Sequence, residues 1–326
     1  MKRAELLSRL LIIAGLVLAV GVPLLLWMRA PLIHVSMAED GGWNPDTLKA
    51  EAGKPLELHL TSNDVVHGFA VGQMDMKSVD VLPGKVTDLT LTFDKPGFYI
   101  FYCTRWCGLN HWRMRGTIEV SGSQSNVETP TVPLYVTLGI DIDAPHEAPI
   151  IPSERPSASA GQQTASSLNI SSLNSTDLYR THSPYLVFEE LSSTSLSDSE
   201  KWEVVGYLWK SSTTSASLAN GKELYAQNCA ACHGENGAGD GVFADDIAAK
   251  GEASMQTMAG SNMMMQTPAN FTDPARMLGA SPALLQGKIL RGGMGTGMPM
   301  WGSIFTEEQI WDLIAYIYSF QFDYEK

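Results

Sequence analysis

The segment YCTRWCGLNHWRM, residues 102–114, constrains this chain most, because it gathers sulfur and imidazole side chains at short regular intervals. It contains Cys103, Cys107, His111 and Met114. A disulfide between the two cysteines would leave the histidine and the methionine without a role. Soft sulfur ligands together with imidazole are typical of copper or zinc. The spacing therefore predicts a metal site in a loop.

A further histidine, His67 in DVVHGF, lies at the end of an earlier predicted strand and is the fifth candidate ligand. A structural zinc site would use two cysteines and two histidines but has no use for Met114. A mononuclear blue-copper site holds a single cysteine, so the second one is in excess. Two cysteines can instead bridge two copper ions, each completed by one histidine. Met114 would bind one copper ion, and a backbone carbonyl of the loop would bind the other. Zinc is the alternative metal for this site.

The sequence around this loop has the pattern of short β-strands. PLELHLTS, residues 55–62, places leucine at every second position. VTDLTLTF (residues 86–93) and FYIFYC (residues 98–103) each follow a Pro-Gly turn signal, and GTIEVSG (residues 116–122) ends the series. Such strands and turns predict an antiparallel all-β sandwich or barrel, which we place at residues 31–122.

The stretch from residue 62 to residue 120 resembles subunit II of heme–copper oxidases, whose C-x-x-x-C-x-x-x-H-x-x-M loop holds the dinuclear copper centre CuA in a cupredoxin fold. The resemblance rests on SNDVVHGF, VLPGKVTDLTLTFDKPGFY and YCTRWCGLNHWRMRGTIEV. It implies six copper ligands: His67, Cys103, the backbone carbonyl of Arg105, Cys107, His111 and Met114. Many members carry Glu or Gln where this chain has Arg105, a difference of side chain that leaves carbonyl ligation open.

Two other families share part of this pattern. Copper chaperones of the Sco type have C-x-x-x-C and a distant histidine, but they lack the following H-x-x-M and use a thioredoxin fold. Nitrous oxide reductases carry a similar CuA domain together with a histidine-rich propeller, whereas this chain has 7 histidines in total. Subunit II remains the better match.

An apolar run, LLIIAGLVLAVGVPLLLWM at residues 10–28, has about the 20 residues that a membrane-spanning helix needs. Basic residues are concentrated before the run, which places the N-terminus in the cytoplasm. A cleaved signal peptide is the alternative, but no small-x-small cleavage site follows the run. We expect a single-pass transmembrane anchor at residues 1–30, as in the B-type branch of the family, with the rest of the chain on the periplasmic side of the cell membrane.

The pattern C-x-x-C-H of covalent heme c attachment occurs at Cys229, Cys232 and His233. The two thiols form thioethers with the heme, and the imidazole binds the iron. A methionine as the second axial ligand raises the iron potential for electron transfer. GGMGTGMPMWG, residues 292–302, offers Met294, Met298 and Met300. Because the ligand of cytochromes c commonly precedes a proline, we expect it to be Met298.

The C-terminal region resembles class I cytochromes c over about residues 218–320. Its last segment, TEEQIWDLIAYIYSF, is predicted to be an amphipathic helix that opens with a capping box of Thr306 and Gln309. We assign residues 218–326 to an all-α cytochrome c domain.

Residues 123–217 separate the two domains and differ from both in composition. Residues 153–177 are rich in serine, alanine, threonine and asparagine, which predicts a flexible tether. SDSEKWEVVGYL at residues 197–208 nevertheless matches TEEQIWDLIAYI at residues 306–317 in its cap, acidic turn, tryptophan and tyrosine. No C-x-x-C-H precedes the first copy. We therefore interpret residues 197–210 as a cytochrome-like helix that packs on the cytochrome domain.

The resemblance implies subunit II of a respiratory heme–copper terminal oxidase, a cytochrome c oxidase, with a fused cytochrome c as in caa-type enzymes. Electrons would pass from heme c to CuA and on to a separate catalytic subunit I, where oxygen is reduced. No catalytic residue is expected in this chain. Two alternatives remain: a CuA-bearing subunit of a nitric oxide reductase of the same superfamily, and a free membrane-tethered electron carrier.

The partners that follow from this interpretation are the catalytic subunit, the membrane and an electron donor such as a cytochrome c or a quinol-oxidising complex. The net charge of −13 argues against nucleic acid as a partner.

Overall fold

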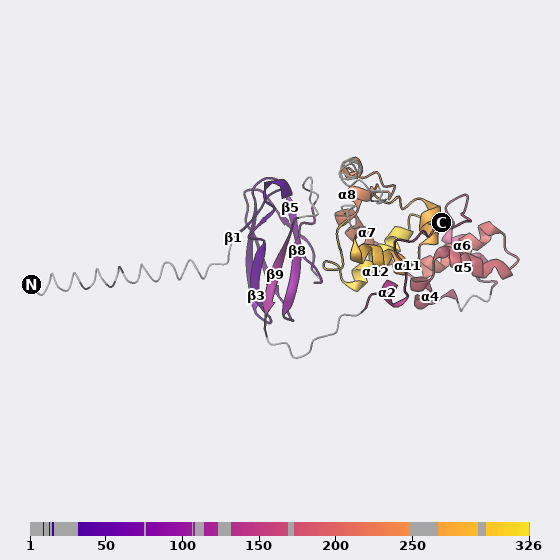
Figure 1. Ribbon diagram of the computed structural model, residues 1–326, viewed down its shortest axis with the longest axis horizontal. Helices are drawn as coiled ribbons and strands as arrows, with labels where there is room; N and C mark the ends of the chain where they lie inside the picture. The colour runs from indigo at the N-terminus through magenta and orange to yellow at the C-terminus, as the bar shows by residue number, and fades with distance from the viewer. Residues whose placement is uncertain are drawn as a thin grey trace, which may run out of the picture. The chain divides into compact units, whose positions relative to one another are not determined.

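The computed structural model of the protein describes residues 9, 13, 15, 32–74, 76–105, 107, 114–122, 132–168, 173–247, 267–292 and 298–325. The chain divides into two compact units, one made of Met1–Ala70 and Ser78–Ser125 and the other of Val71–Lys77 and Asn126–Lys326. Strands make up the first unit and helices the second, as Figure 1 shows. The expected order, an all-β region followed by an all-α region, is confirmed.

The predicted membrane anchor at residues 1–30 falls almost wholly outside the described residues. In the part of the chain that is described, no helix combines the length and the apolar character needed to cross a membrane. The anchor therefore stays a prediction.

Two sheets form the β-unit, with strand orders β2-β1-β4-β7 and β3-β9-β8-β5-β6. Their strands are β1 (Leu32–Val35), β2 (Trp43–Asn44), β3 (Thr47–Glu51), β4 (Pro55–Ser62), β5 (His67–Val71), β6 (Val79–Val81), β7 (Thr87–Thr92), β8 (Gly97–Tyr102) and β9 (Arg115–Ser121), with a short 3-10 turn η1 (Ala38–Asp40) after β1. The four strands expected from alternation and Pro-Gly turns correspond to β4, β7, β8 and β9.

Alternation of side chains explains the core of this unit. In β4, Leu58 and Leu60 are buried at 1% and 0% exposure, because successive residues of a strand face opposite sides of the sheet. Aromatic rings fill the space next to the loop between β8 and β9. Trp43 packs edge-on against Phe69 and Phe101, with ring centroids 5.6 and 5.5 Å apart. This rigid cluster supports the strands that carry the predicted ligands.

Both sheets contain a parallel pair, which differs from the expected antiparallel arrangement. β1 pairs with β4, and β3 pairs with β9, in parallel. In the second pair Leu48 lies opposite Ile118. Turn signals mark where strands begin and end, but they do not say which strands pair. A parallel pair between strands far apart in the sequence leaves no such local signal.

Helices form the second unit: α2 (Leu134–Thr137), α3 (Ala158–Ala165), α4 (Thr176–Thr181), α5 (Pro184–Glu190), η4 (Leu191–Ser193), α6 (Asp198–Ser211), α7 (Ser215–Asn228), α8 (Ala230–His233), α10 (Pro274–Gly279), α11 (Pro282–Arg291) and α12 (Glu307–Tyr318). The predicted capping box is present at the start of α12, where Thr306 accepts from the N–H of Gln309 and the Gln309 side chain accepts from the N–H of Thr306. Ile310, Leu313 and Ile314 lie on the buried face of this helix.

The flexible tether expected at residues 153–177 instead contains helix α3 and the start of α4 where the structure describes it. α3 begins at an N-cap serine, Ser157, and α4 at another, Ser175. Ser, Ala and Thr are compatible with helix when caps and tertiary contacts support it. Ala158 and Ala165 are buried against neighbouring helices, and composition alone could not show this.

Candidate metal centres

The β-unit brings three of the predicted copper ligands together in its interior. The ligating atoms of His67, Cys103 and Cys107 all lie within 4.8 Å of one another, and all three residues are buried. The two sulfur atoms are 3.8 Å apart, far beyond the length of a disulfide bond, about 2.05 Å. Within the described residues, neither cysteine forms a disulfide. Two thiols at this separation, beside an imidazole, fit a pair of sulfurs that share metal ions.

The strand ends explain why these residues meet. Cys103 directly follows β8 and Met114 directly precedes β9, and β8 and β9 are antiparallel neighbours. The N–H of Cys103 donates to the carbonyl of Met114 at 3.1 Å, which closes the loop at its base. The Sδ atom of Met114 lies 3.2 Å from the Sγ atom of Cys107. His67 comes from the start of β5, the strand next to β8 in the same sheet.

Asp64 orients the imidazole of His67. The Nε2 atom of His67 lies 2.7 Å from the Oδ1 atom of Asp64, and its Nδ1 atom lies 3.7 Å from the Sγ atom of Cys103. Nε2 therefore donates its proton to the carboxylate, which leaves the lone pair of Nδ1 for a metal. Burial acts to lower the pKa of His67, but hydrogen bonds to Cys103 and Asp64 outweigh it, so the pKa lies above its ordinary value.

Arg105 contributes its backbone and its side chain to different contacts. Its carbonyl oxygen is 3.3 Å from the Sγ atom of Cys103, at the edge of the cluster. Its guanidinium makes a two-pronged ion pair with Asp80 of β6, with Nε and NH2 at 2.8 and 2.9 Å from the two carboxylate oxygens. These hydrogen bonds raise the pKa of Arg105. The arginine that replaces the usual Glu or Gln is thus paired with an acid.

Trp43 belongs to the surroundings of the cluster, although no pattern in the sequence pointed to it. Its indole N–H donates to the carbonyl of Met114 at 3.1 Å, and its side chain is 4% exposed. The only local signal was a large aromatic residue in the turn-rich segment GGWNP. Of the six predicted copper ligands, His111 is the one that lies outside the described residues.

In the helical unit, the heme-attachment motif lies at the junction of α7 and α8. Cys229 and Cys232 are free thiols, and burial raises the pKa of Cys229 to about 12. The Nδ1 atom of His233 lies 3.0 Å from the carbonyl oxygen of Ala269, to which it donates. Burial lowers the pKa of His233, which favours the neutral imidazole that binds metals. The Nε2 atom is thereby the one suited to iron, so these residues fit a covalently attached heme.

Two aromatic contacts hold this motif in place. Phe271 stacks on the imidazole of His233, with ring centroids 4.5 Å apart and an angle of 19° between the planes. The hydroxyl of Tyr225 in α7 donates to the carbonyl of Gly234 at 2.8 Å. The turn after the histidine is therefore anchored to the preceding helix.

The candidate axial methionines differ in exposure. Met298 is half-buried, whereas Met300 is 63% exposed to solvent. Met294 lies outside the described residues. Between the two that are described, Met298 is the better suited to a buried iron.

Comparison with known protein families matches the two regions separately. Residues 47–121 match the family described as cytochrome c oxidase subunit II, periplasmic domain. Residues 218–321 match the family described as cytochrome c. Both matches agree with the predicted cofactors, dinuclear copper in the first region and heme c in the second.

Among curated proteins, cytochrome c oxidase subunit 2 of Thermus thermophilus is 40% identical over 79 residues, which cover 24% of this chain and 58% of that protein. The same subunit of Apis mellifera ligustica is 39% identical over 70 residues, covering 22% of this chain and 31% of that protein. The chain thus spans less than two thirds of the length of these relatives.

Solved structures with local similarity include a chain of a heme-copper terminal oxidase dimer, 23% identical, which covers 37% of this chain and 98% of that chain with a TM-score of 0.25. The periplasmic domain of subunit II of cytochrome oxidase from Bradyrhizobium japonicum is 25% identical and covers 23% of this chain and 54% of that chain with a TM-score of 0.21. The sequence matches thus show similarity to the periplasmic domain of cytochrome c oxidase subunit II at residues 47–121 and to cytochrome c at residues 218–321.

Proposed function

We propose that this chain is the subunit through which electrons enter a respiratory heme–copper terminal oxidase. The observation that carries the proposal is the presence of two sites of electron-transfer type in one chain, a buried sulfur–imidazole cluster and a C-x-x-C-H motif. The cytochrome c domain accepts electrons from a donor, and the subunit II domain delivers them to a catalytic subunit I. Oxygen is reduced in that subunit and not in this chain.

The proposed copper ligands are His67, Cys103, the carbonyl of Arg105, Cys107, His111 and Met114, and the proposed heme c residues are Cys229, Cys232, His233 and Met298. When bound, the two metal groups supply reversible one-electron chemistry. The protein supplies position: Asp64 and the Ala269 carbonyl each fix one imidazole. Burial keeps water away from the thiols of Cys103 and Cys107. Fixed ligands minimise rearrangement when the charge of a metal changes.

The proposed organisation is an anchor at residues 1–30, a cupredoxin domain at 31–122, a connecting region at 123–217 and the cytochrome c domain at 218–326. The match to a periplasmic domain supports a location on the outer side of the membrane. The basic residues before the apolar run support a cytoplasmic N-terminus and a single crossing.

Isolation of the complete membrane complex tests the function. Reduced cytochrome c should drive oxygen consumption, and the complex should contain a copper pair and a single covalent heme in each copy of this chain. A complex that consumes nitric oxide but not oxygen would instead establish the reductase alternative. A chain that is recovered without any catalytic partner would establish a free carrier.

Electron paramagnetic resonance tests the copper site in the same preparation. A shared electron between two coppers gives a multi-line hyperfine pattern. A four-line spectrum from a single copper, or stoichiometric zinc, would contradict the dinuclear assignment.

A further inference from the structure

Residues 153–212 repeat the architecture of the cytochrome c domain helix by helix. The helices α3, α4, α5 and α6 correspond in order to α7, α10, α11 and α12; the 3-10 turn η4 lies between α5 and α6, and the one-turn helix α8 of the heme-attachment motif lies between α7 and α10. α6 and α12 each open with a capping box, at Ser197 and Thr306. α5 and α11 each open with a serine N-cap followed by proline, at Ser183 and Ser281. The similarity therefore extends beyond the helix pair that is evident in the sequence.

The first and last helices of each copy cross at a glycine. A Cβ atom on Gly161 of α3 would overlap the carbonyl group of Glu203 in α6, and one on Gly221 of α7 would overlap that of Asp312 in α12. Glu203 and Asp312 occupy the same position of the repeat, since each directly follows the tryptophan of its copy. Backbones approach so closely only where a glycine lies at the crossing. The same crossing thus recurs at the same place.

The first copy lacks the heme-attachment residues. Asn169 follows Gly161 at the distance at which Cys229 follows Gly221, and no cysteine of the chain lies between residues 107 and 229. The two thioethers of a heme c therefore have no partner in this copy.

Side chains of the first copy provide its own core. Phe188 of α5 stacks on Trp202 of α6, with ring centroids 4.5 Å apart, and each side chain is 1% exposed. Val187, Leu191 and Val205 are buried beside them. Burial of large aromatic side chains removes much apolar surface from water, so this core has a hydrophobic driving force without a cofactor.

The two copies pack on each other through equivalent elements. α4 contacts α11, and α5 contacts α10, which is reciprocal because α4 corresponds to α10 and α5 to α11. Trp209 and Tyr318 occupy the same position of the repeat and touch each other, with ring centroids 5.9 Å apart. An exchange of equivalent contacts is the signature of a two-fold axis in an isologous dimer.

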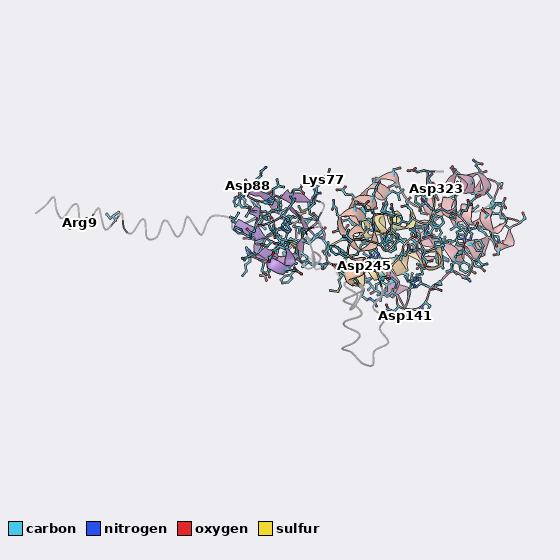
Figure 2. All side chains as sticks on the ribbon, turned by 90° about the horizontal axis from the view of Figure 1, so that it is seen from above. Arg9, Lys77, Asp88, Asp141, Asp245 and Asp323 are labelled. Atoms are coloured by element: carbon cyan, nitrogen blue, oxygen red, sulfur yellow. The ribbon has the colours of Figure 1, made fainter. Side chains whose placement is uncertain are left out.

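The start of the first copy and the end of the second copy are also in contact. The polypeptide itself connects the end of α6 to the start of α7. On the opposite side, the N–H of Ala158 donates to the carbonyl of Asp323, and the N–H of Asp323 donates to that of Pro156, both at 2.9 Å. The guanidinium of Arg155 also donates to the carbonyl of Phe322 at 2.9 Å. Asp323 is labelled in Figure 2, on the helical unit.

We infer that residues 153–325 are a tandem duplication of a cytochrome c fold, packed as a pseudo-dimer, in which the first copy is a heme-free docking partner of the second. The face formed by α10, α11 and the end of α12 is accordingly an interaction surface for a cytochrome-like fold, and the chain supplies the partner in cis. The first copy folds independently of heme attachment. This inference uses none of the copper ligands and does not depend on the oxidase function.

Hydrogen–deuterium exchange on the full chain tests the heme independence. A variant with Cys229→Ser and Cys232→Ser cannot attach heme covalently. Peptides from α7 and α8 should exchange at least about tenfold faster than in the unaltered chain, while peptides from α3 and α6 keep their protection. Equal loss of protection in α3, α6 and α7 would overturn the inference.

A matched pair of glycine variants provides the second test. Gly161→Val should speed exchange in α3 and α6 by about tenfold or more but leave covalent heme attachment and the protection of α7 intact. Gly221→Val should speed exchange in α7 and abolish covalent heme attachment but leave the protection of α3 and α6 intact. If Gly161→Val abolished heme attachment and the protection of α7 to the extent that Gly221→Val does, the two copies would be one cooperative fold and the inference would fail.

Discussion

Trp43 donates the hydrogen of its indole nitrogen to the carbonyl oxygen of Met114, 3.1 Å away. The same carbonyl accepts the N–H of Cys103 at 3.1 Å. The backbone of a proposed copper ligand is therefore held from two directions, by the neighbouring strand end and by a residue far away in the sequence. This double contact fixes the position at which the thioether enters the cluster.

Trp43→Phe removes the indole donor and keeps an aromatic ring in the cluster with Phe69 and Phe101. We expect the free energy of unfolding to fall by about 0.5–1.5 kcal/mol, because the Met114 carbonyl loses one buried hydrogen bond. The reduction potential of the copper centre should shift as well, because Met114 is less firmly placed. Phe98→Leu, at a 76% exposed position, is the control and should change neither quantity. An unchanged potential in Trp43→Phe would show that Met114 is positioned without the indole.

Asp80→Asn breaks the ion pair with Arg105 and should accelerate copper release to a chelator. The side chains are 44% and 57% exposed, so the pair contributes only about 0.2–1 kcal/mol, and release should be a few times faster. Arg105→Gln should accelerate copper release to a similar extent. The double variant should release copper no faster than either single variant. Additive losses would indicate that the two side chains act separately.

Met298→Ala should abolish the methionine–iron charge-transfer band and lower the heme potential, because a thioether ligand stabilises ferrous iron. The heme should remain attached through Cys229 and Cys232. Met300→Ala is the matched control, since that side chain is mostly exposed and precedes no proline. If the control loses the band and Met298→Ala retains it, Met300 is the ligand.

The ion pair between Asp143 and Arg291 predicts a pH-dependent stability of the helical unit. Arg291 NH1 and NH2 lie 2.6 and 2.7 Å from the Asp143 carboxylate, and these hydrogen bonds lower the pKa of Asp143. A lowered pKa in the folded state stabilises the protein above the unfolded pKa, about 3.9, and the contribution is lost as the pH falls through the folded pKa.

Asp143→Asn should therefore reduce the free energy of unfolding at pH 7 by about 0.2–1 kcal/mol, a small value because the carboxylate is 62% exposed. At a second, acidic pH below the folded pKa of Asp143, the variant and the unaltered chain should converge. Urea unfolding at both pH values measures the difference. A difference that persists unchanged at low pH would assign the effect to packing.

Local spacing in the sequence was enough to predict the groups that lie within one loop or one helix turn. Cys103, Cys107 and Met114 belong to a single loop, and Cys229, Cys232 and His233 to a single turn, so the covalent chain keeps each set together. Caps act equally locally, which is why the helix starting after Thr306 was predictable. Pro-Gly turns likewise revealed where β7 and β8 begin, although the strands on the two sides of each turn lie in different sheets.

Only the tertiary structure decided which distant residues meet these groups. His67 reaches Cys103 because β5 lies beside β8, and Trp43 reaches Met114 across the sheet interface. The parallel strand pairs and the glycine crossing of Gly161 with Glu203 depend on register and on backbone approach. These contacts come from the packing of whole elements, whose side-chain directions no short stretch of sequence specifies. For the same reason a segment that is rich in serine and alanine could be read as a tether from its composition and yet fold as helices against a partner.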